Sequence, residues 1–310
     1  IYHCMRIAGW YRLEAHERRL FRWEESRGIG PAIARRALFP IVLGLSTATL
    51  PQSPTPWLAG LQLYTVREPL AADIDRTLRD IADLGYREVE TAGFAAAAID
   101  VLQEKLHRFG LTTPSMHAGY DDLRQNPDGV VAQAAILGST FAVCPSIDAD
   151  QRRTLDDWKR ACETLNRAGS ILRRQGVTLA YHNHDFEFVP FEDGTTPFQL
   201  LTRESDAGDV KLELDVYWLA KASLDPVRSL VDAGGRVVLV HLKDLGRDGS
   251  TVELGAGILD IEAIVRTALL AGVKHLFVEQ DDSPAPLRSI ETSLRFLERL
   301  SPGVRPRSRP

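Results

Sequence analysis

The stretch that decides the fold runs from VKLELDV (210–216) to RVVLVHLK (236–243), two short apolar and β-branched runs separated by a segment of helical length. Such runs indicate buried parallel strands with helices outside them. Outward from this stretch the same alternation continues in both directions, from Gly60 to Gln280, and predicts eight strands. They cover 60–65, 86–91, 111–117, 139–145, 177–183, 210–216, 236–243 and 275–280.

The segments between the strands include amphipathic helix candidates. In DIDRTLRDIADLG (73–85) the apolar residues share one face and Gly85 ends the helix, and residues 155–176 behave in the same way. Eight β-then-α units in roughly 240 residues match the size of a closed barrel. An open doubly wound sheet would carry a Gly-rich phosphate turn after its first strand, and none is present there. The sequence therefore predicts an α/β fold, a single-domain (β/α)8 TIM barrel over residues 57–302.

Residues 1–56 and 303–310 are predicted to lie outside the barrel. Arg35 and Arg36 precede an uncharged run, 37–50. This run is shorter than the roughly 20 residues that span a bilayer, so no stable membrane insertion is expected. An arginine pair before such a run resembles a twin-arginine export signal. We expect an export signal or disordered extension and a flexible C-terminal tail, with the protein periplasmic or secreted; a cytoplasmic protein is the alternative.

The charge distribution limits the partners. The net charge is −5, but residues 1–48 carry eight Arg against four Glu, which leaves 29 Lys and Arg against 38 Asp and Glu, or −9, for residues 49–310. The negative charge of residues 49–310 disfavours nucleic acid as a partner. A homo-oligomer is left open. Cys4, Cys144 and Cys162 show no CxxC pair or regular spacing, and we expect them to be buried apolar side chains.

Active sites of such barrels gather at the carboxyl ends of the strands, where this chain concentrates metal-type side chains. They are Glu90, His117, His182, His184, Glu187, Asp215, His241, Lys243 and Glu279. Converging imidazoles and carboxylates suit one divalent ion, Mn²⁺, Co²⁺, Zn²⁺ or Mg²⁺, and lack the thiolates of structural zinc. An open coordination position would accept a hydroxyl or carbonyl oxygen of a small carbohydrate. His107 and His275 are expected to be structural.

Five motifs in the second half of the chain carry a family resemblance: YHNHDFEF (181–188), LELDVYW (212–218), VHLKD (240–244), LGAGILD (254–260) and FVEQD (277–281). In this order they resemble the xylose isomerase-like TIM-barrel superfamily of sugar phosphate isomerases and epimerases, in particular a YHNH-type subgroup. The resemblance covers residues 60 to 300. It implies one metal ion, Mn²⁺ first, held by Glu, Asp, His and Glu from the fifth to the eighth strands.

The ligands that the resemblance implies are Asp215, His241 and Glu279. At the end of the fifth strand this chain departs from the family pattern, because Tyr181 and His182 stand where relatives carry Glu. The fourth ligand is therefore transferred to Glu187, the nearest carboxylate, with His182 or His184 as the alternative.

The resemblance also implies abstraction of a proton next to a keto group of a sugar or keto-glycoside. His184, His182 and Lys243 are the predicted catalytic residues. Glu90, His117 and Trp218 are predicted to contact the substrate. Trp218 stands where epimerases of this group often have His, which weakens the case for ketose 3-epimerisation.

Isomerase or epimerase activity is the first expectation. Relatives resembling the YHNH subgroup include lyases and dehydratases, so β-elimination from a 3-keto-glycoside is one alternative and a non-catalytic sugar-binding barrel is another. A relative of the apurinic-site endonucleases would need three zinc ions and a basic face, for which this chain has too few suitable histidines and too acidic a body.

Overall fold

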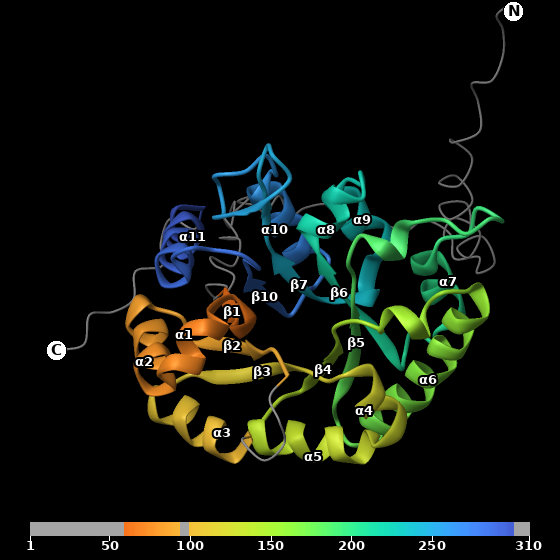
Figure 1. Cartoon of the computed structure of the whole chain (residues 1–310), viewed down its shortest axis with the longest axis horizontal. Coiled ribbons are helices and arrows are strands. Elements are labelled where there is room, and N and C mark those ends of the chain that lie inside the picture. The colour runs from red at the N-terminus through yellow and green to blue at the C-terminus, as the bar shows by residue number, and fades with distance from the viewer. Residues whose placement is uncertain (1–58, 94–98, 301–310) are drawn as a thin grey trace, which may run out of the picture. The chain divides into compact units, whose positions relative to one another are not determined.

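The structure, a computed structural model, describes residues 59–93 and 99–300, which all fall in one compact unit. Eight parallel strands form a closed barrel in the order β1-β10-β7-β6-β5-β4-β3-β2 (Figure 1). They are β1 (Gly60–Gln62), β2 (Glu88–Thr91), β3 (Thr112–His117), β4 (Phe141–Cys144), β5 (Thr178–His182), β6 (Val210–Asp215), β7 (Val237–Leu242) and β10 (His275–Val278). The predicted (β/α)8 barrel is confirmed, with each strand inside its predicted range.

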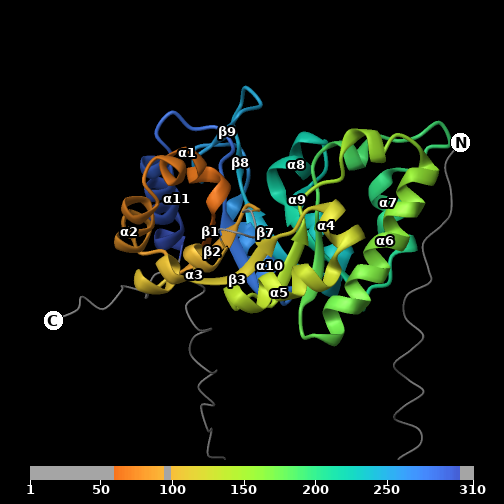
Figure 2. The ribbon, with the colours of Figure 1, turned by 60° about the horizontal axis from the view of Figure 1, so that its bottom comes forward.

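Helices surround the strands (Figures 1 and 2). They are α1 (Arg67–Ala72), α2 (Ile74–Leu84), α3 (Ile99–Arg108), α4 (Tyr120–Gln125), α5 (Pro127–Leu137), α6 (Leu155–Arg174), α7 (Pro197–Glu204), α8 (Val216–Lys221), α9 (Pro226–Ala233), α10 (Ile261–Leu270) and α11 (Pro286–Leu300), with 3₁₀ turns η2 (Leu63–Val66), η4 (Ala149–Gln151), η5 (Phe186–Phe188) and η6 (Gly234–Arg236). Both predicted helices are confirmed. Asp73 caps α2 by accepting a hydrogen bond from Arg76 N, and Gly85 ends it at φ 121°.

The barrel interior contains a small apolar cluster of its own, apart from the larger core. It consists of Phe141, Val143, Ala180, Leu239 and Phe277. Side chains two residues apart on a strand point to the same face. The residues two positions after Ala180, Leu239 and Phe277 are therefore the ones that stand above this apolar layer, and all three are polar: His182, His241 and Glu279. The apolar cluster thus forms a floor beneath a polar layer at the carboxyl ends of the strands.

Two local features differ from the prediction or were absent from it. The first strand is shorter than predicted, because the Gln62 side chain accepts a hydrogen bond from Tyr64 N and the chain turns into η2. The hairpin of β8 (Asp244–Leu245) and β9 (Thr251–Val252) was not predicted, and it stands above the barrel in Figure 2. Asp244 anchors the loop that follows by accepting hydrogen bonds from Gly255 N and Gly257 N.

Some sequence-based predictions concern segments at the chain ends. The predicted export segment, 1–56, and the tail, 303–310, lie outside the described residues and stay predictions. Within residues 59–93 and 99–300, no helix is both long enough and apolar enough to cross a bilayer. Cys144 and Cys162 are free and buried, as expected, whereas Cys4 lies outside the described residues.

Candidate active site

Strand register brings three of the four predicted ligands together, namely Asp215, His241 and Glu279. His182 of β5 is paired with Glu213 of β6, and Asp215 of β6 is paired with His241 of β7. Since paired residues on neighbouring parallel strands point to the same side, these side chains meet inside the barrel. Glu279 follows β10 directly and joins them from the next strand.

His241 lies at the centre of this group and is fully buried. Its Nδ1 is 2.9 Å from Glu279 Oε2, and its Nε2 is 2.7 Å from Glu90 Oε2 and 3.1 Å from Glu213 Oε2. Burial alone would lower the pKa of His241, but the negative charges of these three glutamates hold that pKa well above its usual value. The ring therefore has a carboxylate on both of its nitrogens.

His182 is oriented in a similar way. Its Nδ1 lies 3.1 Å from Glu213 Oε2, and its Nε2 lies 3.9 Å from Asp215 Oδ2. Asp215 has two roles, because its Oδ1 accepts hydrogen bonds from Tyr217 N and Trp218 N and so caps α8, while its Oδ2 faces the site. The capping role and a role in the site are therefore compatible for this side chain.

Lys243 is buried among three carboxylates. Its Nζ lies 2.9 Å from Asp215 Oδ2, 2.8 Å from Glu279 Oε2 and 3.1 Å from both oxygens of Asp281. Burial would lower the pKa of Lys243, but these carboxylates raise it well above its usual range, so the amine is a charged ammonium. The predicted catalytic residue Lys243 thus lies in the site, held by Asp215, Glu279 and Asp281.

Glu90 and His117 belong to a layer next to His241. Glu90 accepts hydrogen bonds from Gln62 Nε2, at 2.7 Å, and from Ser115 Oγ. The His117 Nε2 lies 3.1 Å from Glu90 Oε2. Burial lowers the pKa of His117, but Glu90 and Glu213 outweigh it and raise that pKa to about 9. His117 lines the pocket described below, whereas Glu90 is fully buried and does not.

The structure does not bring Glu187 to this group. Its Oε1 accepts a hydrogen bond from Tyr181 Oη and its Oε2 accepts one from His184 N, both at 2.8 Å. Burial raises the pKa of Glu187 to about 7, although these donors act in the opposite direction. Glu187 thus supports the backbone of His184, and its assignment as a metal ligand stays an untested prediction.

The site opens into a pocket of about 480 Å³. His184 and Trp218 form part of its wall, with ring centroids 5.2 Å apart. The Nδ1 of His184 is buried and has no hydrogen-bond partner among the described residues. Burial and the positive charges of His182 and Lys243 lower the pKa of His184 to about 2. The pocket is lined by Tyr64, Ala92, His117, Pro145, Ser146, His182, His184, Trp218, Lys243, Glu279, Asp281 and Asp282.

The donors fit a divalent cation. Two groups of side chains have potential ligand atoms within 4.8 Å of one another, Glu90, His117, Glu213 and His241 in one and His182, Asp215 and His241 in the other. Asp215 Oδ2 and Glu213 Oε1 are buried and lack a hydrogen bond, although Lys243 Nζ is 2.9 Å from the former. Buried carboxylates need compensating positive charge. Nitrogen and oxygen donors of this kind suit Mn²⁺, Co²⁺, Zn²⁺ or Mg²⁺.

Gln62 and Glu213 belong to this network but are not among the predicted site residues, because both fall in the interior of their predicted strands and not at a strand end. A signal was present for Glu213, because it lies two residues before Asp215 and therefore on the same face of β6.

Comparisons with known proteins identify the family of this chain. The family model described as xylose isomerase-like TIM barrel matches residues 78–300. An inosose dehydratase of Geobacillus kaustophilus is 26% identical over 196 residues, a match that spans 56% of this chain and 63% of that relative. An inosose dehydratase of Clostridium perfringens is 25% identical over 49% of this chain and 56% of the relative. The chain thus matches less than two thirds of the length of these curated relatives.

Among solved structures, a sugar phosphate isomerase/epimerase from Parabacteroides distasonis superimposes with a TM-score of 0.70 at 24% identity, over 83% of this chain and 98% of that one. At this identity the similarity establishes the fold alone. The family match covers most of the barrel, including every strand from β2 to β10. The chain therefore belongs to the xylose isomerase-like TIM barrel family.

Proposed function

We propose that this protein removes a proton from the carbon next to the keto group of a small polyhydroxylated ketone and expels the hydroxyl group of the adjacent carbon as water. The observation that carries this proposal is the pocket in which the uncharged ring of His184, the ammonium of Lys243 and the carboxylate of Glu279 come together. The similarity to inosose dehydratases supports water loss as the outcome.

The metal ligands that we propose are His182, Asp215, His241 and Glu279. In His182, Glu213 contacts Nδ1 and the other nitrogen, Nε2, is directed to Asp215. In His241, Glu90 contacts Nε2 and the other nitrogen, Nδ1, is directed to Glu279. Carboxylates that hold the second nitrogen of a ligating histidine are a common support of metal sites. A bound divalent ion, Mn²⁺ first, would supply Lewis-acid polarisation of the keto group. His182 thus replaces Glu187 in the predicted set.

His184 is the base in this proposal. A pKa of about 2 keeps its ring uncharged at neutral pH, so a nitrogen lone pair is free to accept the proton. Glu187 and the stacked ring of Phe186, with centroids 5.4 Å apart, hold the residue in place. So low a pKa makes His184 a weak base, and the reaction therefore depends on strong stabilisation of the negative charge that develops on the keto oxygen.

Lys243 supplies part of that stabilisation. Its ammonium lines the pocket and is fixed by Asp215, Glu279 and Asp281, so it donates hydrogen bonds without having to reorient. With its pKa raised well above the usual range, Lys243 acts as a donor and not as a base.

The elimination is balanced within the pocket. The proton goes from carbon to His184, the C–H electron pair becomes the new carbon–carbon double bond, and the hydroxyl group leaves with that proton as water. The product is an unsaturated ketone. Isomerisation is the second candidate, because one uncharged imidazole can carry a proton between adjacent carbons on one face of the substrate. Epimerisation would require acid–base groups on both faces.

The test uses metal-loaded protein in D₂O with ketoses, cyclic keto-polyols and 3-keto-glycosides. We expect deuterium at the carbon next to the keto group and, by ultraviolet absorbance, an unsaturated ketone. Deuterium exchange accompanied by formation of an isomeric ketose or aldose would indicate isomerisation instead. Binding of the same compounds without exchange at any carbon would show a sugar-binding barrel and refute the proposal.

A further inference from the structure

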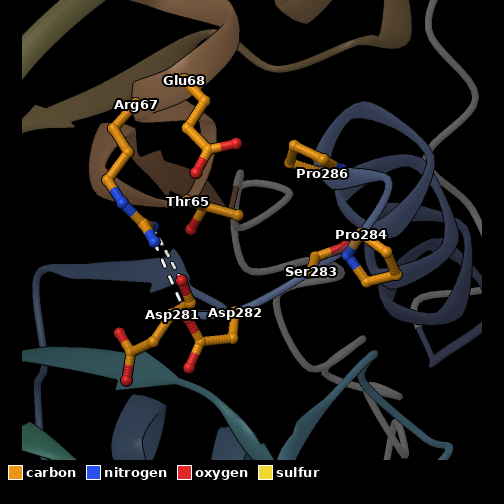
Figure 3. A pocket seen from close by; sticks show the side chains of 8 residues that line it. All are labelled: Thr65, Arg67, Glu68, Asp281, Asp282, Ser283, Pro284 and Pro286. Atoms are coloured by element: carbon orange, nitrogen blue, oxygen red, sulfur yellow. Dashed lines mark hydrogen bonds and ion pairs between the residues drawn. The ribbon is translucent and has the colours of Figure 1, made fainter.

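The rim of the pocket is acidic. Glu279, Asp281 and Asp282 line it, and the Asp282 side chain is 94% exposed. A neighbouring hollow of about 250 Å³ shares Asp281 and Asp282 and adds Glu68 and Arg67 (Figure 3). An anionic substrate would therefore pass several carboxylates before reaching the site.

Arg67 is the cation of that hollow, and its guanidinium is already engaged. It donates hydrogen bonds to Asp281 O at 2.7 Å and to Tyr64 O at 3.0 Å, and its Nη2 lies 3.7 Å from Asp282 Oδ1. Figure 3 shows the side chain directed at this pair of aspartates. Its positive charge is thus offset by the Asp282 carboxylate.

The positive groups that line the pocket are neutralised in the same way. Lys243 faces three carboxylates, and His117 Nε2 lies 3.1 Å from Glu90 Oε2 and 3.6 Å from Glu213 Oε2. Lys221, whose Nζ lies 4.6 Å from the Trp218 ring centroid, is not among the lining residues.

A bound metal ion does not reverse this balance. Six carboxylates surround the site and its rim: Glu90, Glu213, Asp215, Glu279, Asp281 and Asp282. Lys243, Arg67, a divalent ion and a protonated His117 together supply five positive charges against these six negative ones, while His182 and His241 stay uncharged as the proposed metal ligands. The sum is negative.

We propose that this pocket accepts uncharged keto-polyols and excludes phosphate esters. The ketone chemistry rests on the proposed function, whereas the exclusion of phosphate rests on the charges alone. Trp218 offers an apolar ring face to the substrate, and aromatic faces of this kind suit uncharged rings. The substrate class therefore differs from the sugar phosphates after which the Parabacteroides distasonis protein is named.

The experiment compares matched pairs, each a ketose with its terminal phosphate ester, such as D-fructose and D-fructose 6-phosphate. Binding is measured by competition against a bound keto-polyol or by calorimetry, and exchange is followed in D₂O. We expect the ester to bind at least about tenfold more weakly than its parent, because its two negative charges face the acidic rim. Equal or tighter binding of the ester would overturn the inference.

A charge-reversal variant sharpens the test. Asp282→Lys places a cation on the exposed rim, and we expect it to tighten binding of the ester by about fivefold relative to the parent sugar, with the effect reduced at high salt. Asp83→Lys, an exposed residue of α2 outside the pocket, is the matched control and should change neither. If the affinity of Asp282→Lys for the ester relative to the parent sugar equals that of the wild type, the acidic rim does not cause the exclusion.

Failure of the proposed function gives a different result. If no ketose exchanges, binding of inorganic phosphate to the metal-free protein still tests whether the pocket excludes phosphate. We expect no saturable binding at millimolar phosphate, and a saturable site that Arg67→Ala or Lys243→Met abolishes would refute the exclusion independently of catalysis.

Discussion

The His182 ring is held by Glu213, whose Oε2 lies 3.1 Å from Nδ1 in the buried interior of the barrel. Burial alone would raise the pKa of Glu213, but the His117, His182 and His241 rings around it hold that pKa well below its usual range. A charged carboxylate here fixes the orientation of the imidazoles.

Glu213→Gln is therefore expected to weaken metal binding by about 10–100-fold, because the amide orients His182 and His241 less firmly. Competition with a chromophoric chelator measures the affinity. Glu88→Gln is the matched control, since Glu88 pairs with His275 at 2.8 Å in a similar couple at the opposite ends of the strands. A loss of affinity in both variants, or in neither, would contradict the assignment.

Lys243→Met should tighten divalent metal binding by about tenfold. The ammonium contacts Asp215 Oδ2 and Glu279 Oε2, two of the proposed ligand atoms, so it competes electrostatically with the metal ion. Isothermal titration with Mn²⁺ gives the affinity. Lys221→Met, on the exposed end of α8, serves as the control, and its affinity for Mn²⁺ should equal that of the wild type. Weaker binding in Lys243→Met would mean that the ammonium supports the metal site.

His184→Ala should reduce deuterium exchange next to the keto group by about 10²–10⁴-fold while metal content stays at the wild-type level. The pKa of about 2 adds a pH signature, because the base remains uncharged down to about pH 3. Exchange by the wild type should therefore show no loss near pH 6.5 that is attributable to this ring. His107→Ala, an exposed histidine of α3, is the control. Retained exchange in His184→Ala would remove His184 from the mechanism.

Glu187 makes stability depend on pH. Its pKa of about 7 lies above the ordinary 4.5, so the folded protein keeps a proton that the unfolded chain releases in this window. This carboxyl therefore lowers stability as pH rises from about 4.5 to about 7, by up to about 3 kcal/mol. Glu187→Gln should match the wild type at pH 5 and exceed it by about 1–3 kcal/mol at pH 8 in urea unfolding.

The matched control for that variant is Glu192→Gln, an exposed residue of the same segment, for which no pH-dependent difference is expected. The same Glu187→Gln protein also tests the ligand prediction. Metal affinity within about twofold of the wild type would exclude Glu187 as a ligand, whereas a large loss would restore it.

The fold could be predicted because short strand segments, most of them apolar and β-branched, alternate along the chain with segments of helical period. Elements of only a few residues could not be predicted, because they are too short to show a repeating hydrophobic pattern. The strands β8 and β9 have two residues each, and the end of β1 depends on one side-chain hydrogen bond from Tyr64 N to Gln62. Such contacts are set by local geometry that periodicity does not record.

The candidate site was partly predictable for a related reason. Asp215, His241 and Glu279 stand at the ends of strands, where the barrel places active sites, and the structure brings them together. Glu213 lies one layer deeper in the barrel. Its contact with His182 follows from the pairing of β5 with β6, which the sequence alone does not give. Glu187 is the carboxylate nearest to the fifth strand along the chain, whereas in space its two oxygens accept hydrogen bonds from Tyr181 Oη and His184 N.

The apolar floor of the barrel has a kinetic consequence. Phe277 packs so closely over Gly60 that a Cβ there would lie 2.5 Å from its ring, and this layer closes the inner end of the site. As far as the described residues show, the site then opens only at the carboxyl ends of the strands, so substrate enters and product leaves by the same route. A product that lingers must block the next molecule, and steady-state inhibition by product should be purely competitive.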